Sequence, residues 1–340
     1  MIYPDFLKEH GIIGICAPSA GVGHKIDSFN RSLALLKERG WKTWETAHVR
    51  VDDLRGGNAQ ERAQELMSLF SLPAVNAVFC ASGGDFLSEI LPLVDWQLLA
   101  DHPKLLMGAS DPTGLLFPMT TLCDIATVYG SNAGSFDALT TDPATGQDVL
   151  PEYLENTLRI LKGEDIRQKT FPMHLGVAPF LAPEGPLCFD APASDRSAAE
   201  RLDCSGRCIG GCIDVLKDLI GTRFDHAVSF IRRYRDDGII WYFDNFALSS
   251  AVLYRTFLQM RYAGWIDPET TRAILIGRTL FETVESEMPY EEAISRAFPD
   301  IPVISEMDIG HGAPHFTMVN GAILDLHWED RKAELHFRFE

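Results

Sequence analysis

Short apolar runs alternate with longer amphipathic segments over the first 130 residues of the chain. The runs 12–16, 74–80 and 104–108 predict buried strands, and residues 41–44 predict another. Apolar positions at helical spacing predict a helix that ends at Gly40 and a second one over 59–70. Strands and helices in alternation are typical of a parallel sheet covered by helices.

The pattern changes near residues 162–176. Beyond Pro183, short strands and glycine-containing turns predominate, and helices are expected only in a few segments, such as 213–219 and 249–262. We therefore predict an α/β protein of two domains. Residues 1–167 form an N-terminal parallel α/β domain of the Rossmann or flavodoxin-like type, and residues 168–340 form a C-terminal, β-rich α/β domain.

Composition and net charge disfavour several classes of function. The chain has 48 acidic against 30 basic residues, a net charge of −18, which disfavours binding to nucleic acid or to an anionic membrane. No segment resembles a signal peptide or a membrane span, so we expect a soluble, cytoplasmic protein. The seven cysteines fit a reducing compartment better than a disulfide framework.

Two turns in the first half carry candidate chemistry. After strand 74–80, Gly83-Gly84-Asp85 and a predicted helix have the layout of a nucleophile elbow, in which backbone N–H groups face an oxyanion. The same layout also closes a turn in non-catalytic α/β proteins. Ser110-Asp111 follows the next strand, and ligands of open α/β sheets bind at such strand ends. We expect these five residues to bind substrate or an oxyanion.

His311 and Asp244 are the candidates in the second half. His311 lies between two glycines and is either a general base or an ordinary loop histidine. Asp244 ends an apolar strand, where it can orient an imidazole or form a turn. A metal site formed by His311 and His315 is disfavoured, because Gly312 and Pro314 prevent the helix that would align them.

Three cysteines at positions 204, 208 and 212 were a further candidate cluster. Their spacing matches neither zinc nor iron–sulfur patterns, and the glycines between them would break a helix. We interpret them as small packed residues at a strand-to-helix turn.

These segments together resemble the serine carboxypeptidase family that contains bacterial LD-carboxypeptidases and microcin C self-immunity proteins. The resemblance covers nearly the whole chain, and Leu91-Pro92 with Asp95 places it nearer the immunity-protein branch. The segments that carry it are Ile13–Ser19, Glu61–Leu66, Gly83-Gly84-Asp85, Glu89–Asp95, Pro103–Thr113, Gly210-Gly211, Gly221-Thr222 and Gly310-His311.

The resemblance implies a homodimer of two-domain chains, with the active site between the domains. It also implies a Ser–His–Glu triad that works without a metal or organic cofactor. Substrates of the family are peptides cleaved near a free carboxylate, including LD-linked murein peptides, or peptidyl-nucleotide amides. The expected partner is therefore a small peptide or peptidyl-nucleotide ligand.

Carried over residue by residue, the triad is incomplete. The nucleophile position, three residues after Gly84, holds Leu87; Asp244 stands in place of Glu; and His311 is retained. Because an isobutyl group cannot attack a carbonyl, we expect a protein impaired as a serine peptidase that keeps a ligand-binding cleft.

Two alternatives stay open. In the first, a displaced serine is the nucleophile: Ser88 is the obvious choice, with Ser82 and Ser110 near the same sheet edge. A slip of one residue on a helix would, however, turn Ser88 by about 100° away from His311. In the second, His311 and Asp244 activate water directly.

Overall fold

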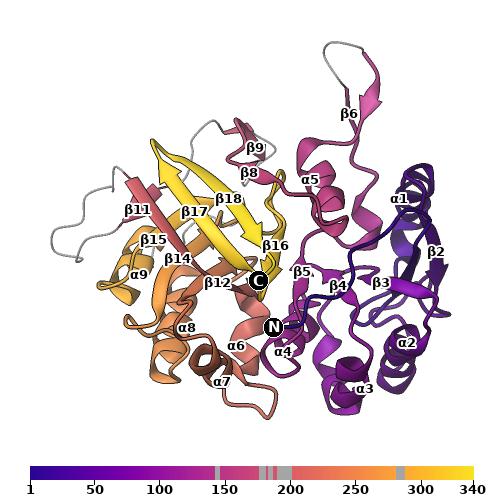
Figure 1. The fold of residues 1–340 in the computed structure, drawn as a ribbon, viewed down its shortest axis with the longest axis horizontal. Coiled ribbons are helices and arrows are strands. Elements are labelled where there is room, and N and C mark those ends of the chain that lie inside the picture. The colour runs from indigo at the N-terminus through magenta and orange to yellow at the C-terminus, as the bar shows by residue number, and fades with distance from the viewer. Residues whose placement is uncertain (142–145, 176–180, 183–186, 190–200, 281–287) are drawn as a thin grey trace. The chain divides into compact units, whose positions relative to one another are not determined.

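The computed structural model describes the chain except residues 142–145, 176–180, 183–186, 190–200 and 281–287. It divides into two compact units, Met1–Ile166 and Arg167–Glu340. Each unit combines helices with a sheet that contains parallel strands, so the predicted α/β class is confirmed (Figure 1). No helix among the described residues is long and apolar enough to cross a membrane.

The first unit is built on a parallel sheet with the strand order β2-β1-β3-β4-β5. Its strands are β1 (Ile12–Cys16), β2 (Lys42–Glu45), β3 (Val75–Cys80), β4 (Leu105–Gly108) and β5 (Thr127–Tyr129). The connecting helices are α1 (Ile26–Glu38), α2 (Ala59–Ser71), α3 (Trp96–Asp101), α4 (Thr113–Thr121) and α5 (Glu152–Leu161). A short hairpin, β6 (Thr140–Thr141) and β7 (Asp148–Val149), precedes α5.

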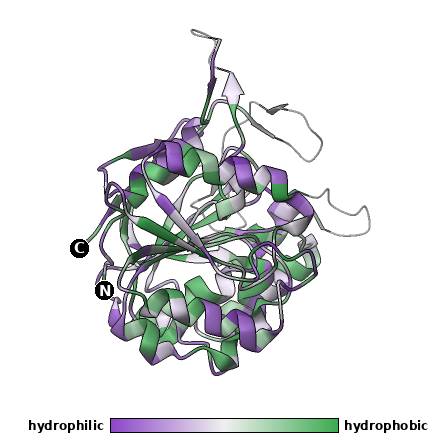
Figure 2. Cartoon of the chain, turned by 90° about the vertical axis from the view of Figure 1, so that its right-hand side faces the viewer, coloured by the Kyte–Doolittle hydropathy of each residue, from purple (hydrophilic) through white to green (hydrophobic). Residues whose placement is uncertain are grey.

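Local sequence explains where these helices begin and end. Asn58 and Glu61 form a capping box at the start of α2, in which each side chain accepts from the other residue's backbone N–H. Gly40, at a φ of +93°, follows α1 and allows the chain to leave it. The inner strands β1, β3 and β4 with β5 are largely apolar and buried, whereas β2 is polar and partly exposed; in Figure 2 hydrophilic stretches occur mainly on the outer elements.

The second unit contains an eight-stranded mixed sheet with the order β11-β15-β14-β13-β12-β17-β18-β8. Its centre, β12 to β15, is parallel, whereas β17, β18 and β8 pair antiparallel. The strands are β8 (Arg167–Lys169), β11 (Leu187–Phe189), β12 (Arg201–Cys212), β13 (Ile239–Asp244), β14 (Thr271–Gly277), β15 (Val303–Met307), β17 (Ile323–Glu329) and β18 (Lys332–Arg338).

Further elements of this unit lie outside that eight-stranded sheet. They are β9 (His174–Leu175), β10 (Leu181–Ala182), β16 (Met318–Asn320), α6 (Ile213–Leu219), α7 (Ala227–Arg233), α8 (Ser250–Tyr262) and α9 (Tyr290–Ala297). The parallel centre is strongly apolar: all six residues of β13 are buried.

The predicted helix directly after the Gly83-Gly84 turn is wrong. The chain instead forms two short 3-10 turns, η2 (Leu87–Glu89) and η3 (Leu91–Leu93), before α3 begins. Pro92 explains the difference, because in a continuous α-helix it has no N–H to donate to the Ser88 carbonyl and its ring would clash with that carbonyl.

The interpretation of the three cysteines as residues of a strand-to-helix turn is correct only for Cys212. Cys212 ends β12 directly before α6, whereas Cys204 and Cys208 lie within the twelve-residue strand. The glycines that would break a helix are tolerated here because the segment is extended.

Candidate functional site

The Gly83-Gly84 turn packs tightly against two neighbouring turns of the first unit. A Cβ atom added to Gly83 would lie 3.1 Å from the Cβ of Ser110, and one added to Gly84 would lie 3.2 Å from the Cβ of Ser19. A side chain at either position would push these neighbours apart by a few tenths of an ångström, so glycine favours the close approach. Ser110 itself adopts a φ of +69°, which is uncommon for a residue with a side chain. Asp85 is exposed at the end of the turn.

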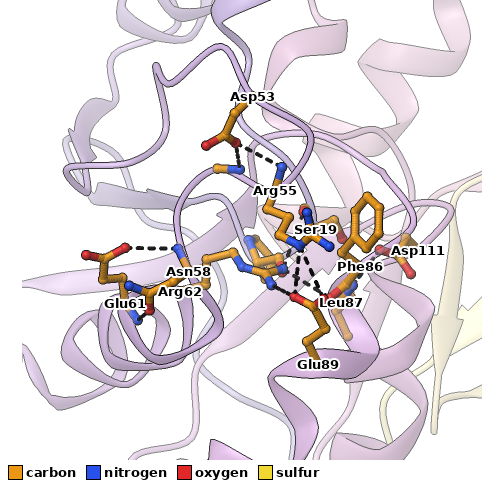
Figure 3. A network of polar contacts seen from close by, with 12 residues as sticks. Ser19, Asp53, Arg55, Asn58, Glu61, Arg62, Phe86, Leu87, Glu89 and Asp111 are labelled. Carbon is orange, nitrogen blue, oxygen red and sulfur yellow. Dashed lines mark hydrogen bonds and ion pairs between the residues drawn. The ribbon is translucent and has the colours of Figure 1, made fainter.

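Leu87 lies at the start of η2 with its side chain fully buried. Its backbone N–H donates to Oδ2 of Asp111 at 2.9 Å (Figure 3). The next residue, Ser88, is exposed. The backbone N–H of Leu87 is thus already bound to a carboxylate, and an apolar side chain occupies the buried position beside it.

Asp111 is a buried carboxylate in an unusual electrostatic setting. Burial raises its pKa to about 6, and the charge of Asp85 acts in the same direction. The hydrogen bond from the Leu87 amide and the charge of Arg62 oppose the rise. A group with this pKa changes its charge just below neutral pH.

Arg62 holds the turn from the side of α2. Its buried guanidinium donates to the carbonyl of Pro18 at 2.8 Å and to that of Phe86 at 3.1 Å, and its Nη2 pairs with Glu89 at 2.6 Å (Figure 3). Arg55 reaches the same Glu89 carboxylate and lies over the Phe86 ring. The backbone around Leu87 is therefore fixed by charged hydrogen bonds on both sides. Sequence reasoning placed Arg62 on a helix but gave it no such role.

The second unit brings Asp244 and His311 into direct contact. Asp244 ends β13 and is buried, and its Oδ2 lies 2.7 Å from Nδ1 of His311. Its Oδ1 accepts from the His311 backbone N–H at 3.3 Å. The shorter side chain of Asp, compared with Glu, therefore still reaches the imidazole. Nε2 is the ring nitrogen left for other chemistry.

Gly310 makes this contact sterically feasible. It adopts a φ of +103°, and a Cβ atom there would lie 2.0 Å from Oδ1 of Asp244. Only glycine allows the backbone to pass so close to the carboxylate.

Two further residues shape the surroundings of the imidazole. Phe246 lies against His311 with ring centroids 4.3 Å apart. Asp214 accepts from the backbone N–H groups of Phe246 and Ala247 at 3.0 Å each, which fixes the loop after β13. Neither role was predicted from the sequence. The available signal was that each follows the carboxyl end of a parallel strand, where polar groups gather.

The pKa of His311 is raised despite burial. Burial lowers it, but the hydrogen bond and charge of Asp244, with the charge of Asp214, outweigh that effect. His315 differs: burial lowers its pKa, and its Nδ1 lies 3.4 Å from the Phe316 carbonyl oxygen. The pKa values of these two histidines are thus shifted in opposite directions.

Comparison with known proteins decides the family. The N-terminal domain of LD-carboxypeptidases matches residues 13–130, and their C-terminal domain matches residues 205–326. The chain belongs to the LD-carboxypeptidase family. This confirms the resemblance to LD-carboxypeptidases and microcin immunity proteins.

Individual members of the LD-carboxypeptidase family align over different lengths. The microcin C7 self-immunity protein MccF of Escherichia coli is 23% identical over 315 residues, which cover 90% of this chain and 87% of MccF. The murein tetrapeptide carboxypeptidase of Pseudomonas aeruginosa is 30% identical over 108 residues, 31% of this chain and 34% of that protein.

Solved structures of the family share the fold. MccF in complex with aspartyl sulfamoyl adenosine superposes with a TM-score of 0.80 at 21% identity, covering 100% of this chain and 99% of that one. The muramoyltetrapeptide carboxypeptidase of Oxalobacter formigenes gives a TM-score of 0.70 at 20% identity, with 96% and 99% covered.

Proposed function

We propose that this LD-carboxypeptidase family member binds a small peptide or peptidyl-nucleotide ligand and is impaired as a serine peptidase. The observation that carries the proposal is the fully buried leucine at position 87, which the family resemblance aligns with the nucleophile. Loss of the nucleophile from a triad leaves only the rate that binding and oxyanion stabilisation provide.

The ligand class follows from the relatives. MccF has been solved with aspartyl sulfamoyl adenosine and with glutamyl sulfamoyl guanosine, and other relatives are named murein peptide carboxypeptidases. The retained Asp244–His311 pair and the fixed Gly83-Gly84 turn support a site that still accepts such molecules. That the protein is a cytoplasmic homodimer remains a prediction from the sequence and the resemblance.

The test separates binding from cleavage. Isothermal titration calorimetry with aspartyl sulfamoyl adenosine should show saturable binding, while chromatography after prolonged incubation should recover the compound intact. An LD-linked murein tetrapeptide should likewise remain uncleaved. Hydrolysis of either compound at a rate abolished by His311→Ala would contradict the proposal.

A second candidate function is hydrolysis in which the Asp244–His311 pair activates water. It is favoured by the 2.7 Å contact and by the imidazole being partly exposed. Because the pKa of His311 is raised, the neutral imidazole that acts as a base forms only at a higher pH than for an ordinary histidine. This mechanism predicts hydrolysis that increases with pH, survives Leu87→Ala, and is lost in both His311→Ala and Asp244→Asn.

A further inference from the structure

Three potential metal ligands meet at the carboxyl edge of the sheet in the second unit. The Sγ of Cys212, a carboxylate oxygen of Asp244 and an imidazole nitrogen of His311 all lie within 4.8 Å of one another. Cys212 and Asp244 end the neighbouring parallel strands β12 and β13 and are paired directly across them. Three separate segments of the sequence thus supply one sulfur, one oxygen and one nitrogen.

This donor set fits a metal of the zinc class. Zn²⁺ accepts thiolate, imidazole and carboxylate ligands, whereas Mg²⁺ and Ca²⁺ prefer oxygen alone. Zinc bonds of about 2.0–2.3 Å in tetrahedral geometry place neighbouring ligand atoms about 3.3–3.8 Å apart. The Asp244 and His311 atoms, now 2.7 Å apart, would separate by about half an ångström, and Cys212 would move inward.

The partial exposure of His311 gives a further ligand access to the three residues. Cys212 and Asp244 are buried, whereas the side chain of His311 is partly exposed. Zinc sites with three protein ligands keep a fourth position for water or a bound molecule, and here that position lies on the solvent side.

A second carboxylate borders the cluster. Oδ2 of Asp214 lies 3.6 Å from Sγ of Cys212, and two backbone N–H groups hold this carboxylate in place. Two carboxylates beside a thiol and an imidazole create a negative local field that favours a cation, and fixed groups next to ligands orient them.

We propose that Cys212, Asp244 and His311 bind a divalent metal ion of the zinc class, with solvent at the open position. The metal replaces the proton shared by Asp244 and His311, so metal binding and proton transfer by His311 exclude each other. This inference does not depend on whether the protein cleaves or only binds its ligand.

Cobalt(II) provides the most specific probe, because a cysteine thiolate bound to Co²⁺ gives an intense near-ultraviolet charge-transfer band. The full-length protein is reduced, stripped of metal and titrated with Co²⁺ alone. The band should saturate with one equivalent and disappear in Cys212→Ser. The matched control is Cys208→Ser, a buried cysteine on the same strand outside the cluster, which should retain the band.

Competition for Zn²⁺ against a chromogenic chelator measures the other two ligands. His311→Ala should weaken Zn²⁺ binding by about ten-fold or more, and Asp244→Asn should do the same. Because Asp244 is buried and its variant can unfold, the partly exposed His311 provides the decisive substitution, with circular dichroism as the check on folding. Saturating Co²⁺ without a thiolate band, a band that persists in Cys212→Ser, or unchanged Zn²⁺ affinity in His311→Ala would overturn the proposal.

Discussion

The Gly83-Gly84 turn of the first unit and the Asp244–His311 pair of the second differ in what they retain. Around the turn, charged hydrogen bonds from Arg62 fix the backbone, yet the position aligned with the family nucleophile holds a buried leucine. In the second unit the polar side chains themselves are in contact at 2.7 Å. Under the proposed function, the first region keeps the scaffold without the reactive group, and the second keeps the reactive groups.

This difference shows that the contacts that position a turn and the side chains that perform its chemistry can change independently. Arg62 and Glu89 stabilise the turn whatever side chain occupies position 87, because their contacts involve backbone carbonyls and each other. Asp244 and His311 have no such independence, since each side chain is the other's partner.

The largest expected effect comes from restoring the missing hydroxyl. Because the turn is already fixed, Leu87→Ser should increase the rate of labelling by a serine-directed fluorophosphonate by about a hundred-fold or more over the wild type. Peptide mass spectrometry should locate the adduct on residue 87. Leu87→Ala controls for the cavity, and a gain in Leu87→Ser that persists when His311→Ala is added would contradict the proposal that His311 activates a side chain at position 87.

Removing the Arg62 guanidinium, whose hydrogen bonds hold the turn, should have the largest effect on the free energy of unfolding. Arg62→Met removes the donor to the buried carbonyls of Pro18 and Phe86 and leaves Glu89 with Arg55 alone, so we expect a loss of about 3–5 kcal/mol in the free energy of unfolding. The matched control is Arg55→Met, which removes an exposed partner of the same Glu89 and should cost less than about 1 kcal/mol. Urea denaturation measures both losses in the free energy of unfolding. Equal losses would show that the buried contacts of Arg62 do not hold the turn.

The pair in the second unit should be sensitive to one methyl group. Gly310→Ala adds both backbone strain and a collision with Asp244, so we expect a loss of about 2–4 kcal/mol and a displaced His311 imidazole signal in NMR spectra. Gly221→Ala is the control, because Gly221 also has a positive φ, +76°, but no heavy atom lies within 4 Å of the added Cβ. Similar losses for both variants would mean that backbone strain alone lowers the stability and that the collision with Asp244 contributes nothing.

The smallest stability effect concerns Asp111. Its folded-state pKa of about 6 exceeds the unfolded value of about 3.9, so the folded protein binds the proton more tightly. The free energy of unfolding should therefore decrease as pH rises from about 4 to 6, by up to about 2–3 kcal/mol. Asp111→Asn should remove this decrease, since an amide can still accept from Leu87 but does not titrate. An unchanged slope in the variant would contradict the assignment.

Sequence reasoning succeeded where a single pattern determines the structure. Apolar runs located β1, β3, β4 and β13, whereas the strand end at Asp244 left open whether its carboxylate orients an imidazole or forms a turn; in the structure it contacts His311. It failed after Gly84, where the effect of Pro92 on the predicted helix was overlooked. It also could not foresee contacts that depend on tertiary packing, such as Phe246 on His311 or Arg62 on the Phe86 carbonyl.

The most direct test of the central claim is fluorophosphonate labelling of the wild-type chain, followed by intact-mass and peptide analysis beside an active LD-carboxypeptidase. The buried leucine at position 87 predicts no adduct under conditions that label the active enzyme fully. An adduct on Ser88, Ser82 or Ser110 that disappears in His311→Ala would contradict the claim and identify a displaced nucleophile.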